Sequence, residues 1–258
     1  LVPLLGAVLS RTRSHAAAPY LTRLLSNPDA AIRLQGVAGL ASNGEASDAR
    51  AIVPLLKDPD GALRGAAISA LSSIGEAEVF DPIADLCTDR DRGARTQALS
   101  ALSSIAAKFD LKDRLVQTLA GAAAAAEGDI LLDLVGALAT SGRAEAVVAL
   151  ARHVSNDRAD IRIAAAGGLA SLGTPEAAEE VADQIAREPE ATVRVALAAA
   201  AVKVRAEGAM PALADWLDDE DEQVKLSALR ALKDLSKTDL GLDREKWIEW
   251  LDRKKKRP

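Results

Sequence analysis

Apolar residues recur along residues 58–75, DPDGALRGAAISALSSIG, at a spacing typical of a helix. They follow one another at steps of four, four and three residues: Leu63, Ala67, Leu71 and Ile74. These steps place the side chains on one face of an α-helix. An Asp or Asn followed by Pro is typical of a helix start, so we expect Asp58 to be the N-cap and Pro59 the first helical residue. Gly75 is expected to end the helix, as Gly142 and Gly173 are expected to end theirs.

The same pattern returns in altered form along the whole chain. A basic residue follows the first apolar position in most copies, at steps of 31 to 36 residues: Arg33, Arg64, Arg95, Leu131, Arg162, Arg194 and Lys225. Six positions earlier most copies have an acidic or amide residue: Asn27, Asp58, Asp89, Ala125, Asn156, Glu188 and Asp219. A shorter apolar segment such as ARAIVPLLK or FDPIADLC precedes each of these helices, so every unit reads as a helical hairpin.

One hairpin cannot bury both of its apolar faces, but stacked hairpins can. The sequence therefore predicts an all-α protein, a right-handed α-solenoid of about seven hairpins. We expect these at 15–44, 45–75, 76–106, 107–142, 143–173, 174–205 and 206–236.

These two sets of equivalent positions, the acid or amide and the basic residue six positions later, resemble HEAT repeats. A unit length near 31 residues resembles their short bacterial, phycobilisome-lyase-type form. The pattern that carries the resemblance is an Asp six positions before an Arg, with an apolar residue directly before the Arg; the second and third units have it in full, and the others vary it. The resemblance implies a structural ladder of ion pairs that joins neighbouring repeats: Asp58, Arg64, Asp89, Arg95, Arg162, Arg194, Asp219 and Lys225. The fourth unit lacks both members and is lengthened by GAAAAAEG at 121–128, so we expect it to be the weak joint.

The two ends of the chain depart from the repeat. Residues 1–14 are expected to be the stub of a preceding repeat, because Leu1, Leu5 and Leu9 fall on core columns. Residues 237–258 are expected to form a capping helix and a basic tail. Two indoles three residues apart, Trp247 and Trp250, would cover the last hairpin.

Composition limits the chemistry that is available. The chain is 49% hydrophobic but only 2% aromatic, so Ala, Leu, Val and Ile must form the core. A net charge of −6 and repeats without stacking aromatics argue against nucleic acid as a partner. One cysteine and two histidines argue against a disulfide or a metal centre, and no cofactor is expected. Cys87 and His153 occupy columns that hold mainly aliphatic residues elsewhere, so both are interpreted as packing residues.

The opening LVPLLGAVLS is apolar for only ten residues, too short to span a bilayer, and no basic segment precedes it. The chain also has no initiator Met, so we expect it to be the C-terminal part of a longer protein. A cytoplasmic location is expected, and a signal peptide lost with the N-terminus stays open. Membrane contact is expected only through the basic residues 253–257.

The outward positions of the second helices are short and almost uncharged, and the resemblance places them on the concave side of the array. The candidate protein-binding residues are Gln35, Ser69, Ser73, Gln97, Ser100, Ser104 and Asp133. No catalytic constellation is visible, so the favoured hypothesis is a non-catalytic scaffold or adaptor that binds a helix or an extended peptide. Binding through the convex face stays open. So does an enzyme subunit such as a bilin lyase or, less favoured, a DNA-repair glycosylase.

Overall fold

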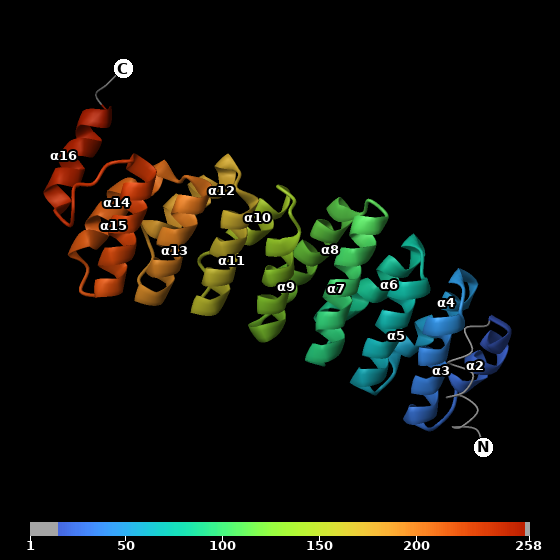
Figure 1. The fold of residues 1–258 in the computed structure, drawn as a ribbon. Helices are drawn as coiled ribbons and strands as arrows, with labels where there is room; N and C mark the ends of the chain where they lie inside the picture. The colour runs from blue at the N-terminus through green and yellow to red at the C-terminus, as the bar shows by residue number, and fades with distance from the viewer. Residues whose placement is uncertain (1–14, 256–258) are drawn as a thin grey trace. The chain divides into compact units, whose positions relative to one another are not determined.

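The computed structural model describes residues 15–255, and within that range every regular element is an α- or 3-10 helix (Figure 1). The all-α solenoid predicted from the repeat pattern is confirmed. The predicted stub at 1–14 and the last residues of the basic tail lie outside the described residues. No helix in the described range is long and apolar enough to cross a membrane.

The chain forms two compact units, one ending at Ala126 and the other beginning at Glu127. In the first unit, paired helices follow one another in chain order. They are η1 (His15–Ala17), α2 (Ala18–Leu24), α3 (Ala30–Asn43), η2 (Ala46–Asp48), α4 (Ala49–Ile52), η3 (Val53–Lys57), α5 (Gly61–Ile74), η4 (Ala77–Val79), α6 (Phe80–Ala84), η5 (Asp85–Thr88), α7 (Arg92–Lys108) and α8 (Lys112–Ala125). The second helices α3, α5 and α7 pack side by side in that order (Figure 1).

The second unit repeats this arrangement. Its helices are α9 (Gly128–Thr140), α10 (Ala146–Ala151), α11 (Ala159–Leu172), α12 (Pro175–Ile185), α13 (Ala191–Val204), η6 (Glu207–Ala209), α14 (Met210–Asp215), η7 (Trp216–Asp218), α15 (Glu222–Ser236) and α16 (Arg244–Lys255). The second helices α9, α11, α13 and α15 pack in order (Figure 1). The division between the units falls inside the predicted fourth repeat, 107–142, and the predicted repeat boundaries stay a prediction.

The core consists mainly of aliphatic side chains, as the composition requires, and Phe80 and Trp247 are also fully buried. Leu63, Ala67 and Leu71 on α5 are almost completely buried, whereas Ile74 at the end of the helix is half-buried. Backbones approach closely where glycine replaces a side chain: a Cβ on Gly168 would lie 2.7 Å from the Cβ of Ala139. Such contacts let neighbouring helices pack without aromatic residues.

The prediction that Asp58 caps its helix is wrong. The N-cap of α5 is Asp60, whose carboxylate accepts hydrogen bonds from the N–H groups of Ala62 and Leu63. The equivalent caps of α3, α7 and α15 are Asp29, Asp91 and Asp221, again two residues after the predicted position. Pro59 therefore lies in the preceding turn rather than in the helix.

Glycines end the helices broadly as predicted. Gly75 and Gly173 are the C-caps of α5 and α11, and Gly142 follows the C-cap of α9 with a φ of 65°. The lengthened segment of the fourth repeat does not form a separate element. Gly121 lies within α8, which continues through the alanine run to Ala125.

The last helix, α16, packs on α14 in the second unit. Trp247 has no exposed surface, and its indole N–H donates to the carbonyl of Gly241 at 2.8 Å. Trp250 is half-buried and meets the Trp247 ring edge-on. Trp247 is therefore packed in the core of the second unit, and the capping role of residues 237–258 stays a prediction.

Candidate functional site

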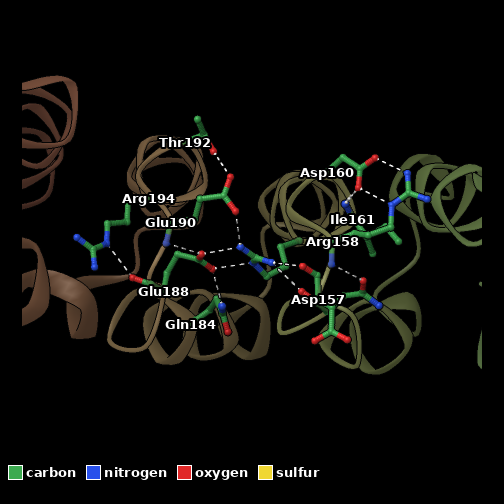
Figure 2. A network of polar contacts seen from close by, with 11 residues as sticks. Asp157, Arg158, Asp160, Ile161, Gln184, Glu188, Glu190, Thr192 and Arg194 are labelled. Atoms are coloured by element: carbon green, nitrogen blue, oxygen red, sulfur yellow. Dashed lines mark hydrogen bonds and ion pairs between the residues drawn. The ribbon is translucent and has the colours of Figure 1, made fainter. Parts of the chain in front are cut away.

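In the second unit a buried ion pair joins two neighbouring repeats (Figure 2). Arg162 on α11 donates from Nε and Nη2 to the two carboxylate oxygens of Glu188, at 3.0 and 2.9 Å. Its Nη1 donates to the carbonyl of Asn156, six positions earlier, at 2.8 Å. The Glu188 side chain is fully buried and also accepts from Gln184. One guanidinium thus fixes the turn before its own helix and the turn of the next repeat.

The first unit contains the same arrangement twice. Arg33 binds both oxygens of Asp58, 25 residues further on, and Arg64 binds both oxygens of Asp89. Asp58 Oδ1 also accepts from the N–H of Asp60 at 3.0 Å. The carboxylate at this position therefore closes a turn and pairs with the preceding repeat, so it is not available to cap the helix.

The protonation of these carboxylates follows from their surroundings. Burial by itself would raise the pKa of Asp58, but hydrogen bonds from Arg33 and from the Asp60 N–H outweigh it, so the pKa lies below its ordinary value. The same competition lowers the pKa of Glu188, with Arg162 and Gln184 as donors. Both groups are therefore ionised at neutral pH and serve structure rather than acid–base chemistry.

The remaining ladder positions differ in what they contact. Arg194 pairs with Asp219 and lies over the Trp216 ring. Arg95 is buried and donates to the carbonyl of Asp89. Lys225 pairs with Glu222 on its own helix, at 4.0 Å.

A groove of about 790 Å³ lies between α5 and α7 in the first unit. Five of the seven candidate binding residues line it, and all five are exposed: Ser69, Ser73, Gln97, Ser100 and Ser104. Ser72, Arg92, Gly93, Thr96 and Ala101 also line it and were not predicted. Counting only three outward positions per helix missed them, although Ser72 and Thr96 directly adjoin predicted residues in the chain.

The hydroxyl groups of the groove are oriented by their own helices. Ser69 donates to the carbonyl of Gly65, and Ser104 donates to the carbonyl of Ser100. Gln97 crosses between the helices and donates from Nε2 to Ser69 Oγ at 2.5 Å. Because these protons are already engaged, the oxygens face the groove mainly as acceptors.

Two candidate binding residues do not line this groove. Gln35 lies on α3, and its Oε1 atom is buried without a hydrogen-bond partner among the described residues. Asp133 lies on α9 in the second unit. Of the seven candidate residues, these two are therefore not among those that line the groove.

The described residues contain no group of three or more His, Cys, Asp and Glu side chains placed to hold a metal ion. Burial raises the pKa of the Cys87 thiol. Burial, together with Arg152, lowers the pKa of the half-buried His153. Both residues have the surroundings of packing groups rather than of a nucleophile and its base.

Sequence models place the repeat in a known family. A model of HEAT repeats matches residues 49–133, and a model of the single HEAT repeat matches residues 209–238. The chain contains HEAT repeats. No curated protein matches it.

Solved structures resemble this HEAT-repeat protein over nearly its whole length. YibA of Escherichia coli is 17% identical with a TM-score of 0.57, and the match covers 93% of this chain and 92% of that one. Kap95p, from a structure that concerns its binding to RanGDP, is 11% identical with a TM-score of 0.62, and covers 92% and 37%. An engineered protein is 19% identical with a TM-score of 0.50, and covers 90% and 74%. At these identities the likeness concerns the fold alone.

Proposed function

We propose that this HEAT-repeat protein is a non-catalytic scaffold that binds a segment of a partner protein in the groove between α5 and α7. The observation that carries the proposal is the groove itself, which is exposed and lined mainly by the hydroxyl groups of Ser and Thr, with Arg92 as a charged residue in its lining. Short side chains let a partner backbone approach closely, and the oxygens accept hydrogen bonds from it. Kap95p, whose fold is similar, is described as binding RanGDP, and a binding role agrees with that.

The bonding of the hydroxyls also defines the partner's chemistry. Ser69 and Ser104 donate to their own helices, so a partner must supply donors of its own. Backbone N–H groups and the side chains of Asn, Gln and Lys meet this need. A segment rich in exposed donors is therefore expected in the groove.

The test is capture of the native partner by the full chain, with melting temperature recorded for each variant. Ser69→Arg and Ser100→Arg introduce bulk and charge into the groove and should weaken capture by about 1–3 kcal/mol. Ser103→Arg is the matched control, because Ser103 is an exposed serine of α7 that does not line the groove. Unchanged capture by folded Ser69→Arg and Ser100→Arg variants would refute the groove as the binding site.

A further inference from the structure

The second unit presents an apolar residue at the same position of each second helix, directly after the ladder position. We call these four residues the apolar row: Leu132, Ile163, Val195 and Leu226. Ile163 and Leu226 are 37% and 45% exposed, and the other two are half-buried. The helices that carry them pack in the order α9, α11, α13 and α15, so the row crosses four repeats. In the first unit the equivalent position holds Leu34, Gly65 and Thr96 in successive repeats, so it is not apolar throughout.

Carboxylates lie one helical turn before the apolar row. Asp129 precedes Leu132 by three residues, and Asp160 precedes Ile163 by three; their side chains are 68% and 48% exposed. Glu222, 67% exposed, precedes Leu226 by four. Residues three or four apart share one face of a helix, so each acid adjoins its apolar neighbour.

Near α13, the third helix of the row, the acid is Glu190, which precedes Val195 by five residues rather than by three or four. In α13, Thr192 precedes Val195 by three residues and donates its hydroxyl to Glu190. Figure 2 shows Thr192, Glu190 and Asp160 on the same side of the buried ion pair. Glu190 also accepts a hydrogen bond from Arg162. Carboxylates therefore accompany the apolar row across the unit, and the one near α13 is held by the buried ion pair.

This edge belongs to the acidic part of the molecule. Residues 127–236 contain 20 acidic and 11 basic side chains, whereas residues 1–126 contain 13 of each. Arg158 lies between Asp129 and Asp160 and offsets one of their two charges. The excess of carboxylates remains and favours a basic ligand.

The floor beside the apolar row distinguishes a helix from an extended peptide. Gly136, Gly167 and Ala199 follow the first three residues of the row by four positions, and Arg230 follows Leu226 in the same way. A Cβ on either glycine would meet no atom within 4 Å. The two glycines and Ala199 offer no side-chain donor or acceptor. An extended peptide would leave its backbone N–H and C=O groups without partners here, whereas a helix satisfies its own. Packed helices lie about 8–10 Å apart, close to the two-turn repeat of about 10.5 Å along a helix.

We propose that the apolar row is the docking site of a basic amphipathic α-helix from a partner protein. Apolar side chains of that helix contact the row at every second turn, and its flanking Lys and Arg side chains reach Asp160 and Glu222. The inference rests on the proposed scaffold function but concerns another surface and another partner chemistry than the groove between α5 and α7.

The experiment measures binding of a fluorescein-labelled synthetic peptide of about 22 residues, enough to cross four helices. It carries Leu in one stripe at heptad spacing and Lys beside the stripe, and fluorescence anisotropy with the full chain gives its Kd. We expect Ile163→Gln and Leu226→Gln each to raise the Kd about tenfold. Asp160→Asn should raise it less, and raising NaCl from about 50 to about 300 mM should weaken binding further.

Matched controls separate this site from non-specific attraction. Leu34 holds the equivalent position in the first unit and is similarly exposed, but alanines stand three and four residues before it in place of an acid. Leu34→Gln should therefore leave the Kd unchanged. Ser100→Arg should also leave it unchanged, which keeps failure of the groove distinct from failure of this proposal. Peptides with the Leu positions scrambled, or with Glu in place of Lys, should bind at least about tenfold more weakly.

Four results would overturn the proposal. They are no binding of the Leu/Lys peptide at about 200 μM, a Kd unaffected by folded Ile163→Gln and Leu226→Gln variants, an equal loss from Leu34→Gln, and equal binding of the scrambled or Glu-containing peptide.

Discussion

The buried pair between Arg162 and Glu188 provides the sharpest test of how neighbouring repeats are held together. Arg162→Met keeps an unbranched side chain of similar helix propensity but lacks the guanidinium, so it removes both hydrogen bonds to Glu188, the one to Glu190 and those to the turn carbonyls. Glu188 would then remain as a fully buried carboxylate held only by Gln184 and the N–H of Glu190. Removing one partner of a buried ion pair costs about 3–5 kcal/mol, and we expect a loss in that range.

The assay is urea denaturation followed by tryptophan fluorescence and by circular dichroism. All three tryptophans, Trp216, Trp247 and Trp250, lie in the second unit, so fluorescence reports on the unit that contains the mutation. The control is Arg187→Met, which removes an exposed pair with Asp183 and should cost at most about 0.5 kcal/mol.

The pH dependence of the loss gives the prediction a second, independent readout. In the wild type the pKa of Glu188 is lowered by folding, so its contribution is present above the unfolded value, about 4.3, and disappears as pH falls through the folded pKa. Without Arg162 the buried carboxylate is expected to titrate above that value, so the variant gains relative stability on acidification. The difference between the two proteins should therefore be largest near neutral pH and shrink below about pH 4.

A loss at neutral pH no larger than that of Arg187→Met would refute the reasoning. So would a loss of about 3–5 kcal/mol that stays constant between neutral and acidic pH, because the cost would then come from packing rather than from an unpaired charge.

Three further predictions concern other parts of the chain. Asp60→Ala should lower the free energy of unfolding in urea by about 1 kcal/mol, because the N-cap of α5 is lost, and a neutral result would contradict the corrected cap assignment. Trp247→Ala should cost about 3–5 kcal/mol in thermal or urea unfolding, because a fully buried indole is removed, and a loss below about 1 kcal/mol would mean that α16 contributes little as a cap. Amide hydrogen exchange should be faster at 120–130 than at 60–75 or 160–173, because the fourth repeat has neither the acid nor the Arg of the ladder; uniform protection would contradict this.

The repeat architecture could be read from the sequence because its signals are local. The spacing of Leu63, Ala67 and Leu71 is a property of one helix, and the same spacing recurs often enough to imply stacking. The burial of Cys87 and Trp247 could also be predicted from local sequence. In each case the spacing of apolar residues nearby in the chain places the side chain on the packed face of its helix.

The position of the helix caps could not be read in this way. Asp58 and Asp60 stand two residues apart before the same helix, and either could cap it on local grounds. Asp58 is drawn into the turn by Arg33, which comes from the preceding repeat and lies 25 residues away in the chain. Only the packing of the two repeats brings that guanidinium to the carboxylate, and this leaves Asp60 as the cap.

The same reason explains why the sequence identified only part of the candidate groove and the tertiary structure was needed for the rest. Outward-facing serines such as Ser69 and Ser100 could be identified by counting along each helix, because direction within a helix is set by its period. The contributions of Arg92 and Thr96 depend on how α5 and α7 lie against each other, and so does the bond from Gln97 to Ser69. The period of a helix determines which side chains face outward. Which of them meet across two helices is decided by the inter-helix packing, and that depends on core contacts between residues about 30 positions apart in the chain.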